Sequence, residues 1–201
     1  MEIRERRADD LDELVAVATR VREVDSYPMF LPDGDFVRFL TRPTPVDAWV
    51  AVEGDELVGH VALHDTTSKP VMRLVAERRS AQPPVYVARL LVDPDWRGHG
   101  LGRRLLEHAR GAAVDAGHTP FLDVVDAPAT AAAIGLYRSD GWVEIGRVTY
   151  ELLGGDIDEL VFQGPLAAPA SAVKQNGSGR AAQGARQKSR RHGGGKARLS
   201  P

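Results

Sequence analysis

An apolar run followed by a glycine-rich loop and a helical pattern is the feature that most restricts the fold of this chain. Residues 85–92 read VYVARLLV, a length and composition typical of a buried strand. The next stretch, DPDWRGHGLG, holds three glycines at alternate positions. A helix is then expected over Gly100–Ala116, with one side formed by Leu101, Leu105, Ala109 and Ala112. A buried strand that is followed by a glycine-rich loop and a helix predicts a strand–loop–helix unit in a sheet.

The rest of the chain up to Phe162 alternates between strand and helix patterns. Apolar residues at helical spacing predict a first helix over Leu11–Val21. Further helices are expected at Phe36–Leu40, Met72–Arg79 and Pro128–Ser139. Strands are expected at Glu2–Arg6, Ala48–Val52, Leu57–His64, Phe121–Val125, Trp142–Leu152 and Ile157–Phe162. A slip in the apolar phase beside Gly146 predicts a β-bulge. This order predicts a mixed α/β sheet with a βαβ unit at its centre.

Composition excludes several classes of protein. Hydrophobic residues make up 43% of the 201 residues, enough for a core, and no apolar run nears the roughly 18 residues that a membrane helix needs. The chain has no cysteine, which excludes disulfides, thiolate zinc sites and cysteine nucleophiles. The first residues, MEIRERRADD, are charged with no apolar segment behind them, so no signal peptide is expected. We expect a cytoplasmic protein.

The formal net charge of −2 hides a division between an acidic domain and a basic tail. Of the 26 Lys and Arg residues, eight follow residue 163, where no Asp or Glu occurs, so residues 1–163 hold 18 basic and 28 acidic residues and a charge of −10. Residues 164–201 have few large apolar side chains and no periodicity, which predicts a disordered tail. The tail is either an arm for nucleic acid or a solvated extension without a task, such as a cloning remnant, and we favour the extension.

Three kinds of phosphate-binding loop can be compared with the glycine stretch. A Walker loop needs Lys followed by Ser or Thr after its last glycine, but two arginines, at 103–104, follow here. A dinucleotide fingerprint begins directly after its strand, whereas five residues separate the strand from the first glycine here. An Arg/Gln-x-x-Gly-x-Gly/Ala loop matches residues 97–102.

This loop suits a diphosphate for a physical reason. Glycine lets backbone N–H groups approach a phosphate without side-chain obstruction, and the start of the following helix adds a favourable dipole. Arg97, Arg103 and Arg104 add cationic donors. The alternative is a tight turn that merely uses glycine, but one glycine usually suffices for a turn. A diphosphate ligand is therefore the favoured interpretation.

The stretch RLLVDPDWRGHGLGRRLLEHA, residues 89–109, resembles the signature of GNAT-type N-acetyltransferases, which bind the pyrophosphate of acetyl-CoA at this loop. LYRSDGW, residues 136–142, resembles the family's Leu-Tyr-x-x-x-Gly-Phe motif, with Trp142 in place of Phe. AWVAVEGDELVGHVAL, residues 48–63, resembles its second and third strands. The resemblance covers residues 2–163. It implies a GNAT-like mixed sheet flanked by helices, with an N-terminal strand, two helices, three antiparallel strands, a βαβ unit with splayed strands, and C-terminal strands.

The resemblance also implies direct transfer of an acetyl group from acetyl-CoA, the expected cosubstrate, to an amine. The strand before the loop would pair its backbone with the pantetheine arm, with an N–H near Leu91 or Val92 on the thioester oxygen. Thr130 stands where the family often has Asn, and Tyr137 matches the general acid that protonates the departing sulfur. The implied cofactor-binding residues are Leu90, Leu91, Val92, Arg97, Gly98, His99, Gly100, Leu101, Gly102, Arg103 and Thr130.

The general base is not evident from the sequence. Family members often carry Glu or His on one face of the strand before the loop, where this chain has Tyr86 and Ala88. Arg89 is expected on the opposite face. The base is therefore elsewhere, a chain of waters, or absent. Candidate residues are His64, Asp65 and Asp123.

No metal site is expected. His60 and His64 share a strand face, but four residues at about 3.3 Å each separate them by roughly 13 Å, too far to bind one metal ion. The other histidines fit the glycine loop, a solvated helix face and a turn.

The leading hypothesis is an N-acetyltransferase that acts on a primary amine in a ternary complex. Small amines, aminoglycoside-like drugs, peptide N-termini and lysine side chains are all open as acceptors, and an acidic domain suits a cationic one. The connection Ser26–Phe36 is expected to wall the acceptor pocket, with Asp33 and Asp35 in a solvated turn. The alternative is a CoA-binding sensor or scaffold without turnover, which the missing strand carboxylate and Thr130 favour. A homodimer is open, nucleic acid would bind only through the tail, and no membrane partner is expected.

Overall fold

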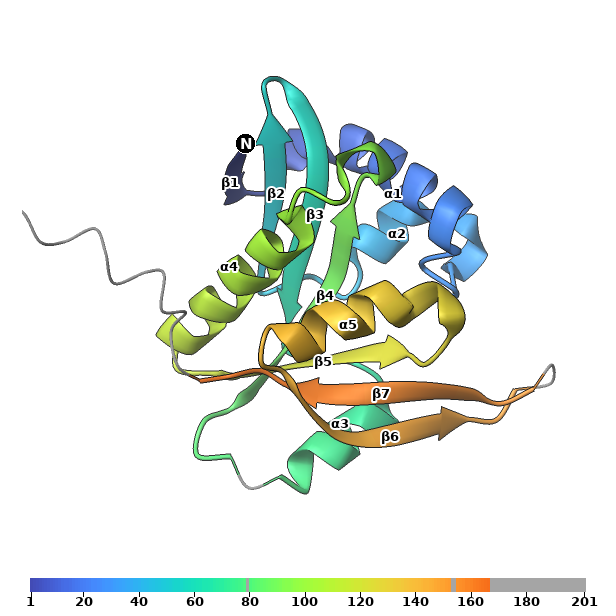
Figure 1. Ribbon diagram of the computed structural model, residues 1–201, viewed down its shortest axis with the longest axis vertical. Helices are drawn as coiled ribbons and strands as arrows, with labels where there is room; N and C mark the ends of the chain where they lie inside the picture. The colour runs from blue at the N-terminus through green and yellow to red at the C-terminus, as the bar shows by residue number, and fades with distance from the viewer. Residues whose placement is uncertain (79, 153–154, 167–201) are drawn as a thin grey trace, which may run out of the picture. The chain divides into compact units, whose positions relative to one another are not determined.

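The computed structural model describes residues 1–78, 80–152 and 155–166, which form a seven-stranded sheet with helices on both faces (Figure 1). The strands lie in the order β1-β2-β3-β4-β5-β7-β6. Their bounds are β1 Glu2–Glu5, β2 Asp47–Glu53, β3 Glu56–His64, β4 Pro84–Val92, β5 Thr119–Val125, β6 Val143–Tyr150 and β7 Ile157–Gln163. The α-helices are α1 Leu11–Asp25, α2 Phe36–Thr41, α3 Lys69–Ala76, α4 Leu101–Asp115 and α5 Ala131–Ser139. The mixed α/β class predicted from the sequence is confirmed.

Two antiparallel groups of strands meet at one parallel pair. β1, β2, β3 and β4 are antiparallel neighbours, and so are β5, β7 and β6. β4 and β5 are parallel, and α4 crosses over between them. The βαβ unit predicted around the glycine loop therefore joins the two halves of the sheet.

β4 and β5 pair only where each strand begins. Their ladder joins Pro84–Tyr86 to Thr119–Phe121. β4 then continues to Val92, and β5 continues to Val125 while pairing with β7 on its other side. Over this described length the two strands share no further ladder pairs. The expected splayed strands are therefore present, and they leave one backbone edge of β4 without a neighbouring strand.

A bulge in β4 turns Arg89 to an unexpected face. Between Ala88 and Leu91 the ladder sets two residues of β4 opposite one of β3. Arg89 has a φ of 54°, in the left-handed region, which accommodates the extra residue. Its Nη1 consequently lies 2.6 Å from His64 Nε2, on the face that Ala88 occupies. The prediction that Arg89 faces the other way is wrong, because a bulge shifts the two-residue alternation of a strand by one.

The helices divide between the two faces (Figure 1). α4 and α5 pack on one face, where Leu101, Leu105 and Ala109 of α4 are buried as predicted. α1 and α2 pack on the opposite face, over β2, β3 and β4. α3 covers that opposite face over β5, β6 and β7 through Val71 and Val75. We call this second face, shared by α1, α2 and α3, the acceptor face.

Most predicted elements are confirmed, with shifted ends. α1 runs on to Asp25, beyond the last apolar residue of its pattern. α3 begins three residues earlier than expected, because the Ser68 hydroxyl accepts a hydrogen bond from the N–H of Val71, the third residue of the helix, and caps the helix there. Arg79, its expected last residue, lies outside the described residues. The register of β6 shifts between Glu144 and Gly146, as the slip in apolar phase predicts.

The predicted tail begins at Gly164, whose N–H still donates to the carbonyl of Pro120 at 2.8 Å. Residues 167–201, nearly all of that tail, lie outside the described residues, so its disorder and its role stay predictions. Within the described ranges, no helix has both the length and the apolar character to span a membrane.

Candidate functional site

The glycine loop joins the end of β4 to the start of α4. Gly98 and Gly100 have φ values of 79° and 76°, which other residues adopt only with strain. A Cβ at either position would meet no atom within 4 Å, so the space in front of the loop is open. Gly100 starts α4 without a side-chain cap, and the first turn holds no acidic residue. The helix start can therefore present N–H groups and a favourable dipole to an anion.

Two ion pairs fasten the glycine loop to α1. The guanidinium of Arg97 lies 2.9 and 2.6 Å from the carboxylate oxygens of Asp25, and it also donates to the carbonyl of Val92 at 3.3 Å. Arg20 of α1 donates from Nε and Nη2 to a single carboxylate oxygen of Asp93, at 2.8 and 2.5 Å. Sequence reasoning missed both pairs, because their partners are 72 and 73 residues apart. The side chain of Arg97 is thus engaged by α1, and its predicted contact with a pyrophosphate stays a prediction.

The other predicted loop residues differ in whether their side chains are accessible to a ligand. His99 and Arg103 are exposed, and Arg103 donates to Ser139 at 2.8 Å. Leu101 is buried in the core under α4, so only its backbone is free to bind a ligand. Gly102 lies against the side chains of that core.

The strand residues predicted to bind the pantetheine arm are anchored by their side chains. Leu90 and Val92 pack toward α4, and Leu91, fully buried, packs toward α1 and α2. Their backbone lies on the edge of β4 that β5 leaves. Thr130 is engaged elsewhere: its hydroxyl lies 2.5 Å from the carbonyl of Val125 and 2.8 Å from that of Ala127. Contacts of these residues with the cofactor stay predictions.

Tyr137 lies on the inner side of α5 and is 8% exposed. Its ring centre is 5.9 Å from that of Phe162 and 6.3 Å from that of Trp142. Burial raises the pKa of the Tyr137 hydroxyl, and the nearby Tyr27 and Asp123 raise it further. The phenol therefore stays protonated at neutral pH and has a proton to donate.

Two carboxylates, Asp123 of β5 and Glu159 of β7, share the acceptor face, and we call them the acidic pair. Thr67 donates to Asp123 at 3.1 Å, and the Tyr150 hydroxyl bonds both Glu159 and, at 2.5 Å, Ser68. Burial raises the pKa of Asp123, and the bond from Thr67 opposes it. Burial also raises the pKa of Glu159, with a further rise from the Asp123 charge. Both carboxylates therefore accept protons more readily than exposed ones do.

Sequence reasoning found Asp123 but missed Glu159. The sequence did contain a sign of Glu159. Every second residue of a strand lies on the same face, so Glu159 interrupts an apolar face between Ile157 and Val161. A lone carboxylate inside an apolar face costs desolvation and is usually retained for a use.

Tyr27 lies in the connection between α1 and α2, the segment predicted to wall the acceptor pocket. Its ring meets that of Phe39 edge-on at 6.0 Å. Burial raises the pKa of Tyr27 to about 12, the charge of Arg89 lowers it, and the charges of Asp123 and Glu159 raise it. The Tyr27 hydroxyl is thus within electrostatic range of both a buried cation and the acidic pair.

The three candidate bases have different environments. His64 is 2% exposed, and its Nε2 lies 2.6 Å from Arg89 Nη1. Since a guanidinium can only donate, Nε2 is the acceptor and Nδ1 carries the proton. Burial, followed by the charge of Arg89, lowers the pKa of His64 to about 4. The Nε2 lone pair is therefore weakly basic, and it already accepts the hydrogen bond from Arg89. Asp65 is exposed. Asp123 combines burial with a raised pKa, which favours it as the base.

His60 is satisfied on both ring nitrogens. Its Nδ1 donates to the carbonyl of Arg89 at 3.0 Å, and its Nε2 lies 3.4 Å from Arg6 Nη1. Burial lowers its pKa to about 3. In the part of the chain that the structure describes, no three His, Asp or Glu side chains come together to hold a metal ion.

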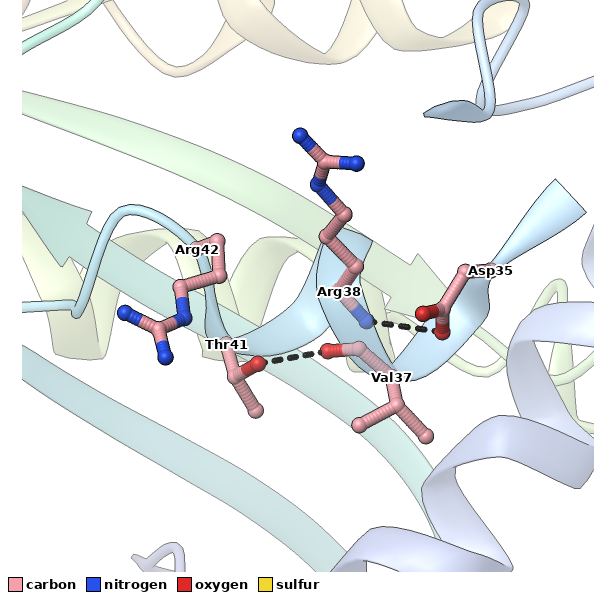
Figure 2. Close-up of a pocket in the computed structure, with 5 residues that line it drawn as sticks. All are labelled: Asp35, Val37, Arg38, Thr41 and Arg42. Atoms are coloured by element: carbon pink, nitrogen blue, oxygen red, sulfur yellow. Dashed lines mark hydrogen bonds between the residues drawn. The ribbon is translucent and has the colours of Figure 1, made fainter. Parts of the chain in front are cut away.

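A separate open pocket of about 550 Å³ lies along α2 (Figure 2). The carboxylate of Asp35 accepts from the N–H of Arg38, and the Thr41 hydroxyl donates to the carbonyl of Val37. The lining residues are Asp35, Val37, Arg38, Thr41 and Arg42. The predicted cofactor and catalytic residues are not among them, but Asp35 belongs to the connection that is predicted to wall the acceptor pocket.

Comparison with known proteins identifies relatives of the chain. Residues 15–142 match the model of the Acetyltransferase (GNAT) family. The chain is 32% identical over 159 residues to the peptidyl-lysine N-acetyltransferase YjaB of Escherichia coli (strain K12), a match that covers 76% of this chain and 88% of that protein.

Solved structures show the same fold. The ribosomal-protein-S18-alanine N-acetyltransferase of Escherichia coli matches with a TM-score of 0.59 and 19% identity, over 87% of this chain and 99% of that one. Arabidopsis thaliana NAA60 in complex with acetyl-CoA matches with a TM-score of 0.59 and 20% identity, over 81% of this chain and 96% of that one.

Proposed function

Because this chain belongs to the acetyltransferase (GNAT) family, and is thereby an acyl-CoA-dependent acetyltransferase, we propose that it transfers the acetyl group of acetyl-CoA directly to a primary amine. The amine nitrogen attacks the thioester carbonyl, a C–N bond forms and the C–S bond breaks. One proton leaves the amine and one joins the thiolate. The observation that carries this proposal is the placement of Tyr137, a buried tyrosine whose pKa is raised by burial and by the charge of Asp123, a half-buried carboxylate that stands where β4 and β5 separate.

For the donor, the proposal uses the unpaired edge of β4 and the glycine loop. The backbone of residues 90–92 binds the pantetheine arm, and an N–H at Leu91 or Val92 polarises the thioester carbonyl. The N–H groups of residues 98–102 and the start of α4 bind the pyrophosphate. The exposed Arg103 adds a cationic donor near the phosphates and the exposed His99 a ring N–H, while Arg97 fixes the loop through Asp25. Thr130 contacts the cofactor from the loop after β5.

Proton transfer is assigned to two buried side chains. Tyr137 protonates the departing sulfur, since burial keeps its phenol neutral. Asp123 takes the proton of the acceptor's ammonium, since burial raises the pKa of its carboxyl and so makes the carboxylate a better base. Glu159 adds negative charge beside it, which favours binding of the acceptor in its cationic form.

The proposed class of acceptor rests on the negative charge of residues 1–163 and on the name of the relative YjaB. The acidic pair and the charge of −10 over residues 1–163 favour a cationic primary amine. The relative YjaB is named a peptidyl-lysine N-acetyltransferase, which makes lysine side chains one acceptor to test beside peptide N-termini and small amines. The alternative of a CoA-binding module without turnover rests on the missing carboxylate of β4. Asp123 on the neighbouring strand offers a carboxylate, which favours turnover.

Calorimetric titration of acetyl-CoA into the full chain tests the donor site. Gly100→Glu sets a carboxylate where the pyrophosphate is proposed, and Gly100→Ala is the matched control with the same backbone strain. We expect binding by the wild type, weaker binding by Gly100→Ala and none by Gly100→Glu. Release of CoA in the presence of amines then tests transfer. Equal affinity in the two variants would contradict a pyrophosphate at this loop.

A further inference from the structure

Arg89 is a buried cation that has no counter-ion among the described residues. It is 8% exposed, and among the described ion pairs none includes it. Its Nη1 bonds His64 Nε2 at 2.6 Å, and its Nη2 donates to the carbonyl of Arg42 at 2.7 Å. The ring of Phe39 lies 5.3 Å from the guanidinium carbon. All three neighbours are neutral, so the buried charge is offset only by two hydrogen bonds and by the face of the Phe39 ring, and not by an anion.

His64, beside that cation, has a buried N–H for which the described part of the chain provides no acceptor. Since its Nε2 accepts from Arg89, its Nδ1 carries the proton, and this Nδ1 has no hydrogen-bond partner among the described residues. His60 provides the contrast on the same strand face, because its Nδ1 donates to the carbonyl of Arg89 at 3.0 Å. Buried polar groups of native proteins are nearly always paired, so an orphan donor beside a cation that no described anion pairs with indicates a missing anion.

Both groups lie at the separation of β4 and β5, where the acceptor is proposed to bind. His64 faces Tyr86, the last residue of β4 that pairs with β5, and Arg89 is the bulge residue three positions later. Asp123 follows the last paired residues of β5 on the same face. The hydroxyl of Tyr27 is influenced by Arg89 and by the acidic pair alike. The acceptor region therefore has a neutral donor on β3 and a cation on β4 on one side, and two carboxylates on β5 and β7 on the other.

We propose that the acceptor of this transferase is an amine that also carries a carboxylate. The carboxylate accepts a hydrogen bond from His64 Nδ1, and the ammonium lies at the acidic pair. This inference rests on the proposed function, because it names the acceptor of that reaction. The carboxylate supplies the acceptor that His64 Nδ1 lacks, and the charge of Arg89, which donates to Nε2 on the other side of the same ring, favours an anion there.

The test compares α-amino acids with their carboxamides as acceptors for the full chain and acetyl-CoA. Nα-acetyl-lysine and its amide extend the comparison to an ε-amine. Two substitutions separate the functions of His64. In His64→Gln the amide oxygen can replace Nε2 and keep the bond from Arg89, but the Nδ1 donor is lost. In His64→Asn the amide nitrogen can replace the Nδ1 donor, and the bond from Arg89 is lost.

We expect the wild type to prefer the acids over the amides at least tenfold in kcat/KM, mainly through KM. His64→Gln should reduce that preference about tenfold, because a hydrogen bond to a charged group is lost, and kcat/KM for the acids should fall more than kcat/KM for the amides. His64→Asn should retain more of the preference than His64→Gln. A preference that survives in His64→Gln, or equal use of acids and amides by the wild type, overturns the inference and leaves the proposed function standing.

A second measurement makes the inference independent of turnover. Titration of each acid and amide into the wild type saturated with CoA measures binding alone and needs no variant to fold. Tighter binding of the acids supports the carboxylate site, and equal dissociation constants reject it. A chain that binds acetyl-CoA but acetylates no amine overturns the proposed function, so the two failures are distinguishable.

Discussion

Arg97 and Asp25 form a two-point ion pair, with N–O distances of 2.9 and 2.6 Å, that ties the glycine loop to the last residue of α1. Each side chain is about one-third exposed, at 35% and 31%. The same guanidinium also reaches the carbonyl of Val92 at the end of β4. A cation so engaged acts more as an anchor of the loop than as a ligand for phosphate, and that distinction can be measured.

Asp25→Asn and Arg97→Gln should weaken acetyl-CoA binding by the same factor. Each removes the anchor that orders the loop, and a partly exposed pair is worth about 1 kcal/mol, so we expect roughly a fivefold loss in affinity. Calorimetric titration measures it. Were Arg97 a phosphate ligand, only Arg97→Gln would lose affinity, and Asp25→Asn would keep or gain it. Arg103→Gln is the matched control, because this exposed arginine should contribute through charge and its loss should reduce the salt dependence of binding.

Tyr137→Phe should lower kcat at least tenfold and leave acetyl-CoA binding within about twofold. The variant keeps the ring between Trp142 and Phe162 and removes only the hydroxyl that holds the proton. Initial rates with a responsive amine, measured beside a titration of acetyl-CoA, separate the two effects. Tyr86→Phe is the matched control, a buried tyrosine on the acceptor face. Unchanged turnover in Tyr137→Phe would remove this residue from the mechanism.

The acidic limb of the pH profile should report Asp123. A base must be deprotonated to act, and burial raises its pKa, so kcat/KM should fall with decreasing pH at a higher pH than an ordinary carboxyl would cause. Thr67 donates to Asp123 and opposes that rise. Thr67→Val should therefore move the limb to higher pH, and Asp123→Asn should abolish it along with most of the activity.

The matched control for that shift is Thr66→Val, at the exposed neighbouring position. It should leave the limb where the wild type has it. A limb that moves to lower pH in Thr67→Val, or does not move, would mean that another group titrates, and Glu159→Gln would be the next variant to profile.

The order of elements and the glycine loop could be predicted from the sequence because both depend on local pattern. The apolar run of β4, the spacing along α4 and the alternate glycines each occupy a short stretch, and the structure agrees with them. The bulge beside Gly146 could also be predicted, because the change in the alternation of apolar residues lies within the sequence of a single strand. Tyr137 was likewise found through a short motif.

The parts that sequence missed depend on contacts between distant residues. Nothing in the run VYVARLLV marks Arg89 as the bulge residue, because β3 and β4 set that register together. Its approach to His64 joins residues 25 positions apart, and the anchor between Arg97 and Asp25 spans 72. Glu159 could have been suspected from the apolar face it interrupts, but only the pairing of β5 with β7 brings it to Asp123. Chemistry at this site therefore follows from tertiary placement of side chains that are locally unremarkable.

The free energy of unfolding should decrease as the pH is lowered, and His64 should account for part of that decrease. Burial, and then the charge of Arg89, lowers the pKa of His64 from 6.5 to about 4, with smaller effects from Asp65, which raises it, and Arg6, which lowers it. Between these pH values His64 binds a proton in the unfolded chain but not in the folded chain. The contribution of His64 to the free energy of unfolding is therefore complete above about pH 6.5 and is lost as the pH falls toward 4. From pH 7 to pH 5 this single group should cost roughly 2 kcal/mol of stability. Urea denaturation of His64→Gln should show a decline over that interval smaller by this amount, while a decline equal to that of the wild type would mean that the pKa of His64 is the same in the folded and the unfolded chain.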